Sequence, residues 1–181
     1  MDPTILFFIS QALSVITAIG AIAAEQMKKM KHILITQTLI SVVVAISYIL
    51  LEGGEVGFIV SLIGAVQSIV MYKYDKEKKS PPILLTLGFV IAFFVLSLYG
   101  NADKIINYFP AVAAVCFALA LTQKNPKIYR IFDFSNAVLW LIYDAYILSG
   151  NFFVHLGIAI SALIGMIRLD GLFKSVKKNN K

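Results

Sequence analysis

Four polar or aromatic side chains stand at helical spacing within the apolar stretch Lys127–Gly150. They are Asp133, Asn136, Trp140 and Asp144, and the spacing of three, four and four residues places them on one stripe of a helix. A charged side chain in lipid costs about 2.5–3.5 kcal/mol, so the stripe must face protein or a water-filled cavity. Asn136 and Trp140 together present an amide and a flat apolar ring, a combination that suits a sugar ring or a nucleobase.

The same residues also fit simpler roles, and the sequence leaves both open. Asn136 can hydrogen-bond between helices, which contributes about 0.6–2 kcal/mol, and Trp140 can fill the core. Asp144, nearer the helix end, fits three situations. It attracts a cationic or hydroxyl-rich ligand if solvated, couples protons with His155 if buried, or reaches the lipid headgroups. Asp133 follows Arg130 by three residues, a spacing that predicts a local ion pair.

Polar residues elsewhere give the stripe something to face. Ser41 and Gln67 lie in apolar stretches that precede it, and a site in the middle of a membrane needs such residues on corresponding helices of two repeats. Single Gln residues also serve as packing devices. Pro110 interrupts another apolar stretch and is a candidate hinge, although a static kink fits equally well.

Composition defines the elements that must position these residues. The chain has 181 residues, of which 59% are hydrophobic and 14% are charged, about half the usual ~25% for soluble proteins. Its mean hydropathy is +0.84. A soluble domain of this size cannot bury so much apolar surface, so the composition predicts a multi-pass, all-α membrane protein.

Seven apolar segments are each about 17–23 residues long, which at 1.5 Å per residue crosses a ~30 Å hydrocarbon core. The predicted helices are Thr4–Ala24, Ile33–Leu51, Val56–Tyr72, Pro82–Tyr99, Ile105–Thr122, Ile128–Leu148 and Phe152–Leu169.

The basic residues predict the orientation. Seven crossings place every Lys and Arg except Lys104 on one side, so the positive-inside rule predicts an N-terminus outside and a C-terminus in the cytoplasm. The net charge of +6 is explained by orientation and by contact with anionic lipid, and we expect no nucleic-acid partner.

The order of the segments predicts a 3+1+3 plan, in which an odd linker helix makes two three-helix units parallel. We expect a first bundle at 1–75, a loop and linker helix at 76–103, a second bundle at 104–172 and a basic tail at 173–181. Ladders of small residues, such as Gly157–Ser161–Gly165, allow close helix contact within a bundle or between copies in a homo-oligomer.

The plan resembles the SWEET-like superfamily, which includes the SWEET sugar exporters, PQ-loop proteins and PnuC transporters. The chain is most similar to the YgjV family of bacterial inner-membrane proteins. The residues that carry this resemblance are Gln11, Gln37, the motif Trp140-Leu-Ile-Tyr143-Asp144 and Arg168. The family motif reads Trp-x-Ile-His-Asn, so Tyr143 and Asp144 depart from it while remaining polar.

The resemblance implies a location in the bacterial inner membrane and pocket positions at Ser41, Gln67, Trp140 and His155. The resulting hypothesis is a transporter or facilitator of a small sugar- or nucleoside-like solute. Its contacts would come from Asn136, Trp140, Ser41, Gln67, Tyr143, Asp144 and His155. The alternative is a membrane scaffold that does not transport. No motif of an enzyme, a cofactor or a metal site is recognisable, and Cys116 is the single cysteine.

Overall fold

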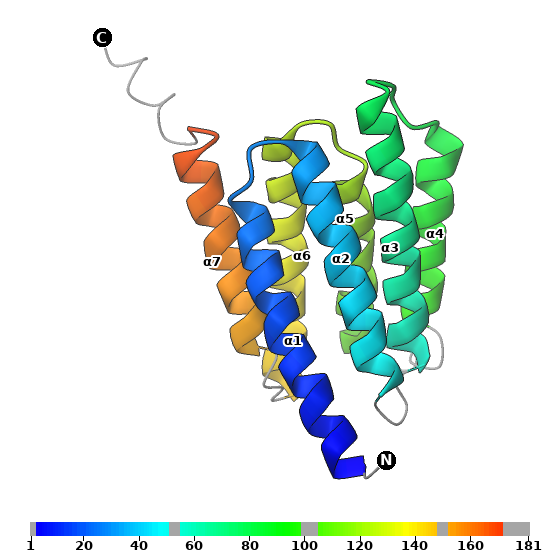
Figure 1. The fold of residues 1–181 in the computed structure, drawn as a ribbon, viewed down its shortest axis with the longest axis vertical. Helices are drawn as coiled ribbons and strands as arrows, with labels where there is room; N and C mark the ends of the chain where they lie inside the picture. The colour runs from blue at the N-terminus through cyan, green and yellow to red at the C-terminus, as the bar shows by residue number, and fades with distance from the viewer. Residues whose placement is uncertain (1–2, 51–54, 99–104, 148–151, 172–181) are drawn as a thin grey trace.

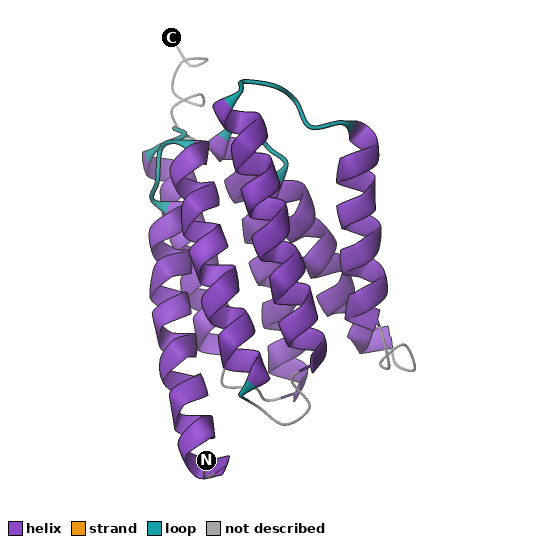
Figure 2. Cartoon of the chain, turned by 45° about the vertical axis from the view of Figure 1, so that its right-hand side comes forward, coloured by secondary structure: helices purple, strands orange, loops and turns teal. Residues whose placement is uncertain are grey.

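The computed structural model describes residues 3–50, 55–98, 105–147 and 152–171, and all secondary structure in these ranges is helical (Figures 1 and 2). The elements are α1 (Pro3–Glu25), α2 (Met30–Ile49), α3 (Glu55–Lys76), α4 (Ile83–Leu98), the short 3₁₀ helix η1 (Ile105–Asn107), α5 (Tyr108–Leu121), α6 (Pro126–Ile147) and α7 (Phe152–Arg168). The prediction of an all-α fold with seven long helices is confirmed for this part of the chain.

The sequence of α6 explains where that helix starts. Pro126 is its first residue, a position where the missing proline N–H leaves no hydrogen bond unmade. The side-chain oxygen of Asn125 accepts a hydrogen bond from the backbone N–H of Lys127 (3.0 Å) and so caps the helix. This fixed start sets the rotation of the α6 side chains.

The helices follow one another around the bundle in chain order. Each is in contact with the next, α1 also packs against α7, and α3 also touches α5. The third helix, α3, is therefore shared between α2 on one side and α4 and α5 on the other. Figures 1 and 2 show α4 at one edge of the bundle.

The interior between these helices is built from small and apolar side chains. Five buried alanines let α5 pack closely against α3, α4 and α6: Ala111, Ala113, Ala114, Ala118 and Ala120. A cluster of Met30, Ile33, Leu34, Met71, Leu121 and Tyr129 fills the end of the bundle near the α1–α2 loop. These two features hold α2, α3, α5 and α6 around the residues predicted to do chemistry.

The outer surface is strongly apolar. Large side chains such as Phe8, Ile19, Leu84 and Phe153 are 64–79% exposed, which lipid tolerates and water does not. By length and apolar composition, two helices qualify as membrane spans: Thr4–Glu25 (mean hydropathy 2.2) and Met30–Ile49 (1.9). Among the described helices, α4, α5 and α7 are apolar but shorter than 18 residues.

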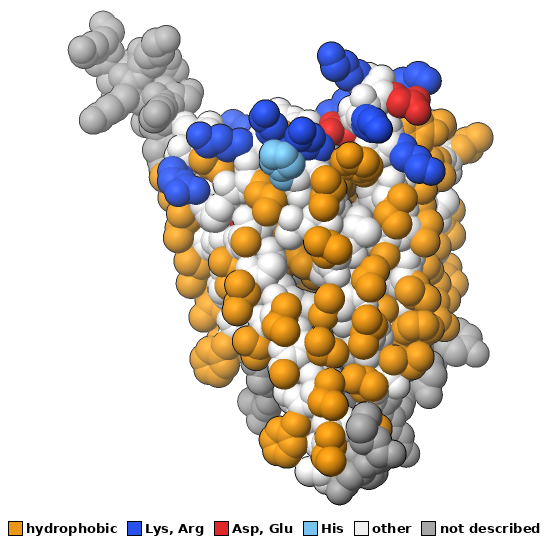
Figure 3. Space-filling model, viewed as in Figure 1, with side chains coloured by type: hydrophobic (Ala, Val, Ile, Leu, Met, Phe, Trp, Pro, Cys, Tyr) orange, Lys and Arg blue, Asp and Glu red, His pale blue; other side chains and the backbone are white. Residues whose placement is uncertain are grey.

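Charge is concentrated at one end of the molecule, and apolar side chains cover the flank that Figure 3 shows. The described Lys and Arg residues lie in or beside the α1–α2, α3–α4 and α5–α6 connections and at the end of α7. We call this the basic end. Lys104, predicted to stand alone on the opposite side, lies outside the described residues.

Candidate functional site

A cavity of about 220 Å³ lies inside the bundle, halfway along the helices. Asn136 occupies the midpoint of the 22-residue α6 and lines this cavity. All seven α-helices contribute to its wall: Ala21, Gln37, Ile40, Ser41, Val44, Val60, Ser61, Gly64, Phe93, Ala114, Phe117, Asp133, Asn136, Trp140, His155 and Ile158. The wall is mainly apolar with a few convergent polar groups, which is the usual make-up of a small-molecule site.

Four of the predicted substrate contacts meet at this cavity. Ser41 of α2, Asn136 and Trp140 of α6, and His155 of α7 all line it. They come from three helices, and the first and last of them, Ser41 and His155, are more than 110 residues apart in the sequence. Only the fold brings them together. Asp133, Asn136 and Trp140, the described side chains of the α6 stripe, therefore face a cavity, as the polarity of the stripe requires.

Trp140 is less free to receive a ligand ring than the sequence suggests. The His155 imidazole stacks on one face of the indole, with 5.4 Å between ring centroids and planes inclined by 10°. Tyr143 meets Trp140 edge to face at 5.8 Å. This packing holds the indole in place and leaves less of its surface for a ligand.

Two predicted contacts lie elsewhere. Gln67 is fully buried and donates from Nε2 to the backbone carbonyl of Ala118 (2.8 Å), so it ties α3 to α5 outside the cavity wall. Tyr143 lies behind Trp140 and is not a lining residue. The side chain of Asp144 lies outside the described residues, so its predicted role stays a prediction.

Pro110 lies in the first turn of α5, directly after η1. A proline is tolerated there because the first N–H groups of a helix have no intrahelical partner. The α-helix thus begins around Pro110 and is not broken by it, which corrects the expectation of an interrupted helix; the hinge itself stays a prediction.

A second cavity, of about 270 Å³, adjoins the first between α1, α2 and α7. The two share part of their walls, at Ala21, Ile40, Val44, His155 and Ile158. The second cavity also reaches Gln11 and Tyr48, toward the start of α1 and the end of α2. The hollow therefore extends away from the basic end.

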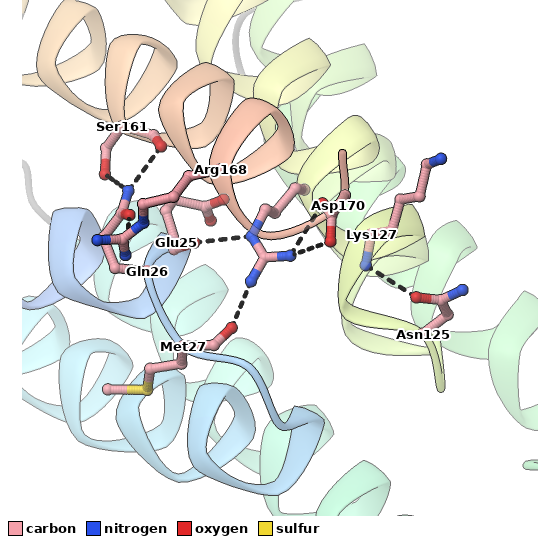
Figure 4. A network of polar contacts seen from close by, with 9 residues as sticks. Glu25, Gln26, Met27, Asn125, Lys127, Ser161, Arg168 and Asp170 are labelled. Carbon is pink, nitrogen blue, oxygen red and sulfur yellow. Dashed lines mark hydrogen bonds and ion pairs between the residues drawn. The ribbon is translucent and has the colours of Figure 1, made fainter. Parts of the chain in front are cut away.

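About one turn from Asp133 toward the basic end, Arg130 is 1% exposed and lies at the centre of a polar network. Its Nη1 donates to both carboxylate oxygens of Asp170 (2.9 and 3.0 Å), its Nε to the backbone carbonyl of Glu25 (2.7 Å), and its Nη2 to that of Met27. Figure 4 shows these three acceptors around one guanidinium. The network joins α6 to the end of α1 and to the residues that follow α7.

This network corrects one expectation. The predicted ion pair between Arg130 and Asp133 is wrong, because the long Arg130 side chain reaches Asp170 instead. Asp133 accepts a hydrogen bond from Asn136 Nδ2 (3.2 Å) and lines the cavity. Beside this network, Arg168 Nη2 donates to Gln26 Oε1 (2.8 Å).

The small-residue ladder on α7 packs within the bundle. The Ser161 hydroxyl donates to the carbonyl of Ile22 (2.9 Å), and Gln26 Nε2 donates to the Ser161 hydroxyl (2.8 Å). A methyl group on Gly165 would come within 2.7 Å of the Glu25 carbonyl oxygen. The ladder is therefore used for contact between α1 and α7.

The sequence did not predict a set of buried polar side chains that lies between the cavity and the basic end. Glu25, the last residue of α1, is fully buried, and the Gln37 amide donates to the hydroxyl of buried Tyr129 (2.6 Å).

The described residues form no group of three or more His, Cys, Asp or Glu that could hold a metal ion. At the surface, Lys79 lies 2.8 Å from Glu77, and this contact lowers the pKa of the exposed Glu77 carboxyl.

A model of the family Imp-YgjV, described as a bacterial inner membrane protein, matches residues 8–172. The match covers α1 from residue 8 onward, the other six α-helices in full and the whole lining of both cavities. No curated protein and no solved structure shows a significant match to the chain.

Proposed function

The chain belongs to the Imp-YgjV family of bacterial inner membrane proteins, and from this premise we propose that it is a multi-pass transporter or facilitator of a small solute. The single observation that carries the proposal is the cavity at the middle of the helices, with Ser41, Asn136, Trp140 and His155 in its wall. A transporter needs a binding site at this depth, and a site that combines an amide, a hydroxyl and an aromatic ring fits a polar ring compound.

The size of the cavity limits the solute. Its volume of about 220 Å³ falls below the range of about 300–1,000 Å³ usual for small-molecule sites. A single sugar ring or a nucleoside-like compound suits this space better than a larger ligand. The hydroxyl of Ser41 and the amide of Asn136 are the groups we expect to orient it.

The helix contacts support the 3+1+3 plan. If α1, α2 and α3 correspond to α5, α6 and α7, the contact of α1 with α7 maps onto the contact of α5 with α3. The middle helices of the two units, α2 and α6, then carry Ser41 and Asn136, and α4 lies outside both units. This is the relation expected of parallel repeats around one site.

The charge distribution supports a cytoplasmic basic end. The hollow then continues toward the outer side through the second cavity, while the Arg130 network closes the cytoplasmic side. Alternating access requires one side closed at a time, and the buried Arg130–Asp170 pair is the contact that must break for the cytoplasmic side to open.

The rival function is a membrane scaffold that uses the same fold without transport. It is favoured by the hydrogen bonds that the Gln67 and Asn136 side-chain amides donate inside the protein. A scaffold has no need of a cavity with convergent polar groups at the middle of the bundle, and the cavity therefore makes us prefer the transporter.

Uptake by purified protein in liposomes tests the proposal. Radiolabelled D-glucose, ribose and uridine serve as probes, and Trp140→Ala is compared with Tyr146→Ala. Tyr146 lies on the same helix but is 65% exposed and outside the cavity wall. We expect at least one probe to enter, with uptake lost in Trp140→Ala and kept in Tyr146→Ala. Equal uptake in both variants would remove the cavity from the transport path.

A further inference from the structure

Two buried carboxyl groups lie at the cytoplasmic side of the cavity. Glu25, at the end of α1, is 0% exposed, and Asp133, on α6, is 4% exposed. Their side chains lie within hydrogen-bonding reach of each other. Neither group can donate when ionised, so this contact becomes a hydrogen bond only when a proton lies between the two carboxyls.

The described neighbours of Glu25 supply no charged donor that is free to pair with its carboxylate. Neither of its carboxyl oxygens accepts a hydrogen bond within the described part of the chain. Arg130 is close, but its Nε, Nη1 and Nη2 are directed to the backbone carbonyls of Glu25 and Met27 and to Asp170. Its charge is thus paired with a different carboxylate.

The other groups around the pair are neutral or more distant. On α6, the Tyr129 hydroxyl accepts a hydrogen bond from Gln37 of α2 and faces Glu25, to which its own O–H is the neutral donor available. Cys116 of α5 and His155 of α7 interact with Asp133 at longer range. From α1, α2, α5, α6 and α7, the described surroundings therefore offer Glu25 no positive charge that is not already paired with Asp170.

Burying an ionised carboxylate without donors or a paired charge costs several kcal/mol, and two carboxylates in contact do not both ionise near neutral pH. One added proton turns one carboxyl into a donor for the other, removes the repulsion between two charges and leaves one negative charge shared by the pair. A metal ion would instead separate the carboxyls by its own bonds of about 2.0–2.6 Å to each oxygen.

We propose that Glu25 and Asp133 form a proton-binding site that holds one shared proton beneath the solute cavity. Asp133 lines the cavity and accepts a hydrogen bond from Asn136, so the proton site and the solute site share a wall. When the proton leaves, an O–H bond of the pair breaks, the proton passes to cavity water, and both carboxylates remain. The proton-binding site itself does not depend on the proposed transport. The role of this proton as the ion that couples to solute movement rests on the proposed transport.

Infrared spectroscopy of the purified protein tests the site without any transport. Wild type at neutral pH should show the C=O stretch of a protonated carboxyl that disappears in Glu25→Gln. The matched control is Asp75→Asn, which removes a half-buried carboxyl at the end of α3, away from the pair and from Arg130, and should leave the band intact. Absence of the band from wild type, or its persistence in Glu25→Gln, would overturn the proposal.

A second variant covers the case in which Glu25→Gln does not fold. Asp133→Asn removes the partner of the shared proton, so the wild-type band should shift to the position of a lone carboxyl or vanish. An unchanged band position in Asp133→Asn would also overturn the proposal.

Coupling is tested separately, by uptake of D-glucose, ribose and uridine into liposomes with and without an inward-directed proton gradient. We expect the gradient to raise wild-type uptake several-fold and to leave uptake by Glu25→Gln unchanged. An equal response in both proteins would reject coupling through this pair. If no probe enters wild-type liposomes, the proposed transport fails for these solutes, while the infrared result still decides the proton site.

Discussion

Replacing Gly165 by Ala should disrupt the Arg130 network and destabilise the protein. A Cβ at this position would lie 2.7 Å from the Glu25 carbonyl oxygen and 2.9 Å from both Cδ and Nε of Arg130. Ordinary contact begins at 3.4 Å, so the backbone at Glu25 or the Arg130 side chain must move by at least 0.5 Å. Such a movement separates the Arg130 Nε from the carbonyl that it now meets at 2.7 Å.

The size of the effect follows from two contributions. Overpacking a well-packed interior costs about 1–3 kcal/mol, and losing a hydrogen bond to a charged group costs about 1.5–3 kcal/mol. The better helix propensity of Ala returns about 0.5–1 kcal/mol, which leaves a net loss of about 2–5 kcal/mol. At about 2–4 °C per kcal/mol for a chain of this size, the unfolding midpoint should fall by about 5–15 °C.

Reaction of Cys116 with a thiol-reactive dye during heating in detergent measures the midpoint, because this is the only cysteine in the chain. The matched control is Gly88→Ala on α4, where an added Cβ meets no atom within 4 Å. The control should match wild type or exceed it slightly. A midpoint for Gly165→Ala within ~2 °C of the control, which corresponds to less than about 1 kcal/mol, would refute the reasoning.

Two further predictions concern the cavity and the Arg130 network at the basic end. Gly64→Ala adds a methyl group to the cavity wall, 3.2 Å from Ser41 Oγ and 3.5 Å from Phe117. Solute uptake should therefore fall, while the free energy of unfolding, followed by the thermal midpoint, changes by less than about 1 kcal/mol. Unchanged uptake would contradict the assignment of this cavity as the solute site. Asp170→Asn leaves the Arg130 charge buried without its ion pair and should destabilise the protein by about 3 kcal/mol. The measurement is the same thermal midpoint, compared with that of Asp75→Asn, which makes the same change at a half-buried carboxyl at the end of α3. Equal midpoints would show that the Arg130–Asp170 pair contributes nothing to stability.

The sequence predicts the parts of this structure that depend on local pattern. Apolar length and the loop signals give seven helices, and the spacing of Asp133, Asn136 and Trp140 correctly places them on a face that needs a cavity. Asn125-Pro126 marks the start of α6 because capping and proline preference act within a few residues. The membrane location follows from composition and agrees with the matched family.

The errors arise where a side chain chooses between partners that are distant in the sequence. Arg130 and Asp133 have the spacing of a helical ion pair, but Arg130 is long enough to reach Asp170 beyond α7. Gln67 is polar and near the middle of α3, yet the rotation of that helix directs it to the Ala118 carbonyl. No local pattern reports the rotation of one helix against another.

Glu25 was missed for a related reason. A carboxyl at the end of an apolar helix usually reaches water, and its sequence context gives no sign of burial. Burial results from the packing of α6 and α7 across the end of α1, which is a property of the whole bundle.

The central claim is that the cavity is a water-accessible solute site, and cysteine labelling tests it most directly. In a Cys116→Ala background, Ser41→Cys places a thiol in the cavity wall, and Ser68→Cys places one at a fully buried position on α3 outside it. Both substitutions exchange a hydroxyl for a thiol at nearly constant size. The account predicts that a small hydrophilic thiol reagent labels Ser41→Cys in the folded protein and spares Ser68→Cys. If Ser41→Cys reacts no faster than Ser68→Cys, the cavity is closed to water, and the protein fits the scaffold better than the transporter.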